Sequence, residues 1–398
     1  MTKRLLNISA AVWAMAIVLT TLTACHYDVR RGLLGHAIQQ QRAAEGVQEG
    51  RGETLGVASR GTAAGHGDAV SVPQGCLPVT PFKDQGLSEA CWIYATLAAI
   101  ETEHLMQGDS VNLSAQWLVR AMAEREATDC YLTGRRPSMR GTIMMALSLL
   151  EDAGMVPYDS YRGREDGPSS RVLLRRIMEQ ARAMSASRRP LADFRRHISD
   201  MLDESLGAPP RHVFMLGAEY TPVEFAHSVA VPGEWQVFTS FLHHPFHRPF
   251  APELRDNQWS QTAMNVPLDE LLAMVVRSLR EGHPVIWEGQ MPSEGESGSK
   301  DESNVERRKY KEQSVKSNVD ALARERQQRF ERRELLDQHC MAIIGMSHRK
   351  DGTMLFYCKN SWSAMPIVTM TEHDLLSNTI LLGVNRKALQ CAPPSRRP

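Results

Sequence analysis

The chain has 398 residues, with 46 Lys+Arg against 46 Asp+Glu, so its formal net charge at pH 7 is zero. Apolar residues at 42% and charged residues at 23% exclude a wholly disordered chain, and seven cysteines are too few for a disulfide scaffold. The balanced charge argues against nucleic acid as a partner, because phosphate binding needs surplus Lys and Arg.

The N-terminus has the pattern of a targeting segment. Lys3 and Arg4 precede an apolar stretch, Leu5–Leu22, which ends in the sequence Leu-Thr-Ala-Cys at Cys25. This order predicts a bacterial lipoprotein signal over residues 1–25, with Cys25 as the lipidated new N-terminus and a lipid anchor in the membrane. A plain secretory signal is the second interpretation, and an uncleaved anchor is the third, since a run of about 18 apolar residues is marginal for spanning a bilayer. We therefore expect the protein in a bacterial cell envelope, facing the periplasm or the exterior.

The next segment differs in composition from the rest of the chain. Residues 26–72 are rich in Gly, Ala, Gln and Arg and have almost no aromatic residues, which predicts a flexible tether. The folded domain is predicted over residues 73–389, with helical insertions at about 161–335. The Pro-rich basic end, residues 390–398, is predicted to be a disordered tail.

The first motif is TPFKDQGLSEACWIYATLAAIE, residues 80–101. Apolar residues at helical spacing begin only after Cys91, so we expect Cys91 at a helix N-terminus. The helix dipole there stabilises a thiolate. A small buried hydrophobe is the alternative reading of a single cysteine. Gln85 lies six residues upstream in a Gly-containing loop, where its amide can bind a developing oxyanion together with the Cys91 N–H.

The second motif is DQHCMAIIGMSHRKDGTMLFYCKNSWS, residues 337–363. Two apolar runs flank a turn at residues 350–352, which predicts a β-hairpin. His339 opens the first strand and Asn360 closes the second, so both are expected at one end of the hairpin. A nucleophilic cysteine needs a base and a third group that orients the base, and these residues supply both. Trp362 is expected to cover the His–Asn hydrogen bond.

These motifs resemble the papain-type cysteine peptidases: KDQGLSEACW matches the nucleophile segment, QHCMAIIG the histidine segment and KNSW the asparagine segment. The resemblance implies an α+β, two-lobed fold, with a helical left lobe and an antiparallel β-sheet right lobe. Cys91 and His339 are 248 residues apart, about 100 more than in ordinary papain and cathepsins. This insertion, together with Ser88 at the position of a common disulfide cysteine, resembles the bleomycin hydrolase/aminopeptidase C branch. Further similar segments are EYTPVEFAHSVAV, TSFLHHPFHRPFAPELRDNQW, EGHPVIWEG and GVNRKAL.

The resemblance implies an activity and its site residues. Hydrolysis of peptide bonds would proceed through a thioester on Cys91, with His339, Asn360 and Gln85 in catalytic roles. The expected substrate-binding residues are Trp92, Arg140, Gly141 and Trp362. No cofactor and no metal is implied, the partner is a peptide or protein substrate, and a homo-oligomer is an expectation of the family. Aminopeptidase action is favoured over endopeptidase action, because NRKAL resembles a C-terminal arm that lies in the cleft of such aminopeptidases.

Several positions depart from the family pattern. Gln338 stands where Asp is usual, Cys340 where a small residue is common and Ser363 where Gly is usual. Glu89 adds a negative charge near the thiolate, which should raise its pKa unless the side chain points to solvent. A weakly active or inactive peptide-binding lipoprotein is therefore an alternative, as is acyl transfer through the same thioester.

The remaining segments carry weaker signals. Residues 113–126 and 140–154 are predicted helices, with Gly154 as a C-cap, and the Arg-rich residues 171–206 are predicted to be helical with a solvated face. His243, His244 and His247 invite a metal interpretation, but prolines interrupt the run and no third ligand stands at useful spacing, so a structural loop is expected. Residues 291–338 are expected to form an exposed loop and a charged helix. Cysteine pairing, including a Cys340–Cys358 pair across the hairpin, stays open.

Overall fold

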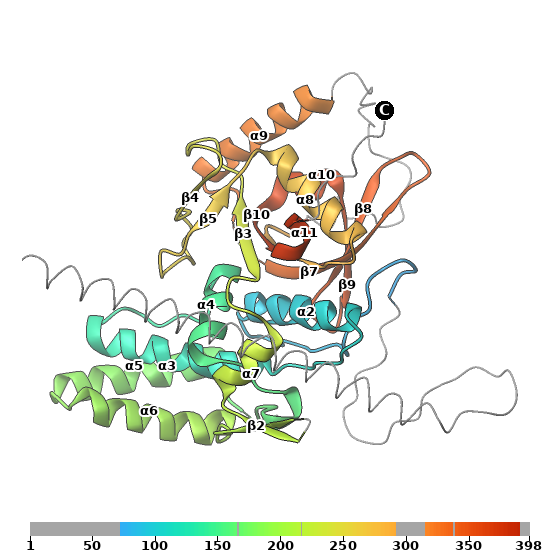
Figure 1. The fold of residues 1–398 in the computed structure, drawn as a ribbon. Helices are drawn as coiled ribbons and strands as arrows, with labels where there is room; N and C mark the ends of the chain where they lie inside the picture. Colours follow the sequence, from blue (N-terminus) through green and yellow to red (C-terminus); the bar gives the residue numbers. More distant parts are fainter. Residues whose placement is uncertain (1–71, 165–166, 216, 292–314, 337–338, 391–398) are drawn as a thin grey trace, which may run out of the picture. The chain divides into compact units, whose positions relative to one another are not determined.

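The computed structural model describes residues 72–164, 167–215, 217–291, 315–336 and 339–390 (Figure 1). The predicted signal with Cys25, almost all of the predicted tether, Gln338 and residues 391–398 lie outside this range. Within the described residues, no helix combines the length and the apolar character that a bilayer crossing would need. The chain divides into two units, and the larger one, residues 66–213 and 221–398, contains the helices, the main sheet and the candidate site.

One group of helices follows the first motif. It consists of α2 (Cys91–Met106), α3 (Ala115–Thr133), α4 (Ile143–Ala153), the 3-10 turn η2 (Tyr158–Ser160), α5 (Ser170–Ala186), α6 (Leu191–Leu206) and α7 (Pro222–Val229). Helix α2 packs against α3 and α4, and α3 packs against α5 and α6 (Figure 1). The Thr142 hydroxyl caps α4 by accepting from the N–H of Met145, and Gly154 ends the helix at φ 76°, as expected.

One sequence prediction is confirmed and another needs correction. Residues 171–206 are helical, as predicted, and form two helices, because Pro190 has no N–H to continue a helix and Arg188 takes the left-handed conformation at φ 51°. Residues 161–335 are not purely helical insertions, since they supply four strands of the main sheet. A helical pattern can be read locally, but membership of a sheet depends on partners that are distant in the chain.

The main sheet has eight strands in the order β4-β5-β3-β10-β6-β7-β8-β9. They are β3 (Trp235–Thr239), β4 (Arg248–Phe250), β5 (Ala263–Asn265), β6 (Val285–Gly289), β7 (His339–His348), β8 (Met354–Lys359), β9 (Ile367–Thr371) and β10 (Thr379–Asn385). All pairings are antiparallel except that of β3 with β5. A separate two-stranded sheet consists of β1 (Val213–Met215) and β2 (Ala218–Tyr220).

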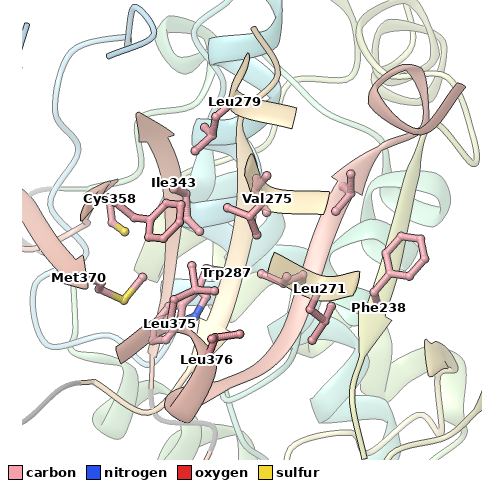
Figure 2. Close-up of a cluster of buried hydrophobic side chains, with 14 of the residues drawn as sticks. Phe238, Leu271, Val275, Leu279, Trp287, Ile343, Cys358, Met370, Leu375 and Leu376 are labelled. Atoms are coloured by element: carbon pink, nitrogen blue, oxygen red, sulfur yellow. The ribbon is translucent and has the colours of Figure 1, made fainter. Parts of the chain in front are cut away.

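A hydrophobic core lies between this sheet and α8 (Leu268–Arg280) (Figure 2). Leu271 and Val275 repeat at helical spacing and are buried against the sheet, where Trp287 and Ile343 are fully buried. The other helices of this region are α9 (Val315–Glu331), α10 (Glu372–Asn378) and α11 (Arg386–Gln390). This packing fixes β6 and β7, whose ends carry the candidate site.

The predicted hairpin is confirmed. β7 and β8 pair antiparallel around a turn that contains residues 350–352. The register places Cys358 opposite Ile343 on β7, while Cys340 lies opposite Glu288 on β6. Cys340 and Cys358 are therefore not cross-strand partners, and the structure has both residues as thiols. Besides pairing with β6 and β8, strand β7 packs against helix α2, and this contact brings the two sequence motifs together.

Candidate active site

Cys91 is the first residue of α2, as predicted. The preceding residue, Ala90, makes no side-chain cap, and no acidic residue lies in the first turn. The first N–H groups of the helix are therefore not satisfied by a capping side chain and can stabilise a negative charge on the cysteine sulfur. The rest of α2 is buried nearly all round, which holds its N-terminus rigidly in place.

His339 and Asn360 meet at one end of the hairpin. The Nε2 of His339 lies 2.6 Å from Oδ1 of Asn360, and the Asn360 amide donates to the carbonyl of Met365 at 2.9 Å. These bonds make Nε2 the protonated ring nitrogen and leave Nδ1 for Cys91. Trp362 stacks on the imidazole, with ring centroids 4.2 Å apart, and so shields the His–Asn hydrogen bond from water.

The Cys91 thiol is strongly acidified. A hydrogen bond from the Cys340 thiol makes the largest contribution to holding the pKa of Cys91 well below its usual range. The hydrogen bond and charge of His339 and the Cys340 N–H act in the same direction, while burial opposes them. Glu89, expected to oppose a thiolate, is exposed to solvent and is not among these causes. The site therefore favours the thiolate form of Cys91.

Gln85 is held beside the nucleophile by backbone and side-chain contacts. Its N–H donates to Ser361 O at 2.9 Å, its Oε1 accepts from the Ser361 hydroxyl at 2.5 Å, and its Nε2 donates to Ser88 O at 2.6 Å. An amide nitrogen carries two N–H groups, so one donor remains beyond the bond to Ser88. Ser361 directly follows Asn360, and the same segment therefore orients both predicted polar groups.

Cys91, Gln85, His339 and Trp362 line one cleft together with three predicted substrate-binding residues, Trp92, Arg140 and Gly141. Trp92 is buried, and its indole N–H donates to Met139 O at 3.0 Å. A Cβ at Gly141 would come within 2.7 Å of this ring, so only glycine fits there. Asn360 does not line the cleft itself but acts on His339 from behind.

Three carboxylates that the sequence reasoning did not single out as binding groups also line the cleft: Glu89, Asp256 and Glu288. Asp256 is buried and forms an ion pair with Arg140 at 2.6 Å. Glu288 is 1% exposed, and its Oε2 accepts the N–H of Ile143 at the start of α4, at 2.8 Å. A glutamate inside the apolar strand sequence VIWEG was the available signal for Glu288, because charged residues are rarely buried without a partner or a function.

A buried charged network lies behind the site. Glu101, 1% exposed, accepts hydrogen bonds from the Thr80 hydroxyl at 2.5 Å and from the N–H of Leu113 at 2.6 Å, and it pairs with Lys83. Lys359 donates to the carbonyl and hydroxyl oxygens of Thr80 at 3.0 and 2.9 Å. The network joins the segment before Cys91 to α2 and to the strand that ends at Asn360.

Lys359 is expected to make stability depend on pH. Burial lowers its pKa from 10.5 to about 8, so between these values the unfolded chain binds more protons than the folded one. The free energy of unfolding should therefore rise with pH across this window, by an amount on the order of a few kcal/mol. Urea unfolding at a series of pH values would measure the rise, which Lys359→Met should lack. An identical pH dependence in both proteins would contradict the assignment.

The histidine-rich loop contains a grouping that the sequence did not reveal. His243 and His244 both contact the exposed Glu253, at 3.1 and 2.8 Å, and the three ligand atoms lie within 4.8 Å of one another. Gln327 Nε2 lies 2.8 Å from Nδ1 of His243, while its Oε1 accepts from Leu242 N–H. Nδ1 of His243 is thus the acceptor, and Nε2 carries the proton that faces Glu253. Because a metal would need a lone pair on Nε2, this tautomer favours a hydrogen-bonded loop.

The C-terminal arm packs away from the cleft in its described part. Helix α11 contacts α8 and β10, Lys387 pairs with Glu234 at 3.2 Å, and Ala388 is buried. None of residues 385–390 lines the cleft. The continuation of the arm, residues 391–398, lies outside the described residues.

One family and several solved structures are similar to this chain. Residues 67–171 match the family described as papain family cysteine protease. Pepw from Lactobacillus rhamnosis HN001 is similar in structure, with a TM-score of 0.56 and 15% identity over 80% of this chain and 83% of that one. Procathepsin L 3 of Tenebrio molitor larval midgut gives a TM-score of 0.36 and 13% identity, covering 80% and 71% of the two chains. Xylellain, a cysteine protease from Xylella fastidiosa, gives 0.35 and 11%, covering 78% and 85%.

No curated protein matches the chain. The matched segment contains Gln85, Cys91, Arg140 and Gly141, whereas His339 and Asn360 are brought to it by the fold. The chain thus has a papain-like α+β fold and carries, over residues 67–171, the sequence features of the papain family of cysteine proteases.

Proposed function

We propose that the protein is a cysteine peptidase that hydrolyses peptide bonds through Cys91, His339 and Asn360. The observation that carries this proposal is the acidified Cys91 thiol at the N-terminus of α2, in contact with a histidine that Asn360 orients. A cysteine with a purely structural role needs neither a neighbouring histidine nor an open cleft beside its sulfur.

The mechanism follows from these contacts. The Cys91 thiolate attacks the scissile carbonyl carbon, and Gln85 Nε2 with the Cys91 N–H stabilises the oxyanion. The protonated His339 gives its proton to the leaving amine as the C–N bond breaks, which leaves a thioester on Cys91. His339 then takes a proton from water, whose oxygen attacks the thioester and releases the acid, restoring the thiolate–imidazolium pair. Asn360 holds the imidazole in the required orientation throughout.

Labelling with the thiol-directed epoxide E-64 tests this function. We expect a single adduct on Cys91 by intact mass and peptide mapping, together with cleavage of a peptide library. A folded, reduced protein that forms no adduct and cleaves no peptide would instead be the peptide-binding alternative. An adduct without hydrolysis, but with transfer of the acyl group to an added amine, would identify the acyltransferase alternative.

We further propose aminopeptidase action, as the bleomycin hydrolase/aminopeptidase C resemblance implies. Arg140 forms an ion pair with Asp256, and Glu89 and Glu288 are the other two carboxylates that line the cleft. Of these two, only Glu288 is buried, and its Oε2 accepts the N–H of Ile143 at the start of α4. A buried carboxylate close to the nucleophile suits the ammonium group of a substrate N-terminus.

Glu288→Gln should weaken the binding of peptides with an unmodified N-terminus more than that of N-acetylated peptides. The amide keeps the size of the side chain and an acceptor for Ile143 N–H but removes the charge. We expect KM for peptides with an unmodified N-terminus to rise about tenfold, the equivalent of one charge-assisted hydrogen bond, with little change for N-acetylated peptides. Steady-state kinetics on matched peptide pairs would measure the difference.

Glu89→Gln is the matched control, because it removes an exposed carboxylate from the same cleft. Its effect should be small, since solvent screens an exposed charge. If the wild-type protein cleaved N-acetylated peptides at internal bonds as fast as unmodified ones, and Glu288→Gln changed neither, endopeptidase action would replace this proposal.

A further inference from the structure

A second cysteine lies against the proposed nucleophile. Cys340 follows His339 on β7, is 3% exposed and lines the same cleft as Cys91. The Cys340 thiol hydrogen-bonds to the Cys91 sulfur. Helix α2 packs directly on β7, so two main elements of the fold hold the backbones of the two cysteines side by side.

The surroundings of the two sulfurs differ. Cys340 lies opposite Glu288 on β6, and both residues line the cleft, so a carboxylate is a close neighbour of this thiol. His339 and the helix N-terminus favour a negative charge on Cys91, and the Cys340 thiol donates a hydrogen bond to that sulfur. Cys91 is therefore the sulfur that reacts first, and Cys340 is the second thiol beside it.

We propose that Cys91 and Cys340 are a modification site for low-molecular-weight disulfides, which convert the pair into a reversible intramolecular disulfide. The Cys91 thiolate attacks one sulfur of the oxidant RSSR, the S–S bond breaks, and the RS⁻ that leaves takes the proton of His339. Cys340 then gives its proton to the now neutral His339 and attacks the Cys91 sulfur, which expels the second RS⁻, and that RS⁻ takes the same proton from His339. Two protein thiols are oxidised, and one RSSR is reduced to two RSH.

The modification has a functional consequence, which rests on the proposed peptidase activity. In the disulfide the Cys91 sulfur is no longer a thiolate and cannot attack a carbonyl carbon, so hydrolysis stops until a reductant restores both thiols. The disulfide also keeps Cys91 from oxidation to sulfinic acid, which is irreversible for most proteins. A protein with a small residue in place of Cys340 could not form this disulfide, and it would lack both the reversible inactivation and the protection.

Oxidised glutathione provides the test on the full, reduced chain. We expect the intact mass to fall by two hydrogens, peptide mapping to recover a Cys91–Cys340 cross-link, and E-64 labelling to be lost and then restored by dithiothreitol. In Cys340→Ala the mixed disulfide has no internal thiol to resolve it, so a glutathione adduct should persist on Cys91. Cys358→Ala, which removes a buried cysteine of the neighbouring strand, should still form the cross-link.

Three results would overturn the proposal: a persistent glutathione adduct on Cys91 in the wild-type protein, a cross-link between Cys340 and Cys358, or no reaction at Cys91. Peptide mapping of the oxidised wild-type protein tests the proposal even if a variant fails to fold. A protein that forms the Cys91–Cys340 cross-link with oxidised glutathione, but hydrolyses no peptide when it is reduced, would support this inference and refute the peptidase proposal. The two proposals can therefore fail separately.

Discussion

Cys91→Ala is expected to reduce peptide hydrolysis by a factor on the order of 10⁴ or more, because no other group at the site can form the thioester. His339→Ala should lose a comparable amount, since the thiolate partner and the proton donor for the leaving amine are removed together. Residues that act as one unit are not additive, so the double variant should be hardly slower than either single one. Initial rates on the best peptide substrate would give these factors.

The matched control for Cys91→Ala is Cys130→Ala. Cys130 is a buried cysteine on α3 that does not line the cleft, so its loss should leave hydrolysis and E-64 labelling unchanged. Circular dichroism and thermal unfolding would establish that all variants are folded. Substantial hydrolysis by Cys91→Ala would place the nucleophile elsewhere and refute the mechanism.

Glu101→Leu is expected to lower the free energy of unfolding by about 3–5 kcal/mol. Glu101 is buried with Lys83, Thr80 and Leu113 N–H as its partners, and all three lose their acceptor in the variant. Removing one member of a buried charge network costs more than its hydrogen bonds alone, because the remaining groups stay desolvated without compensation. Chemical denaturation would measure the change.

Two further variants show whether the charge or the shape of Glu101 matters. Glu101→Gln keeps an acceptor for Leu113 N–H but not the charge, so its loss of stability should be intermediate. Glu151→Ala, at an exposed position on α4, should change stability by no more than about 0.5 kcal/mol. If Glu101→Leu were as stable as the wild type, the network would not be what ties the segment before Cys91 to α2.

Local sequence determined much of the first motif and of the hairpin. The apolar spacing after Cys91 predicted the start of α2, and the two apolar runs around residues 350–352 predicted β7 and β8. Helix periodicity, turn residues and strand alternation are properties of neighbouring residues, so they can be read without a structure. The His339–Asn360 contact followed for the same reason, since a hairpin brings its two ends together.

Contacts between residues far apart in the chain are visible only in the folded structure. The papain-type motifs and the order of Cys91, His339 and Asn360 can be read from the sequence. The sequence did not determine that β3–β6 belong to the main sheet, that Glu288 and Asp256 line the cleft, or that Cys340 faces Cys91. Those contacts join β6, β7 and α2 through strand register and helix packing. A single sequence carries no local signal for either, because the free energy that selects them comes from burial of the whole core.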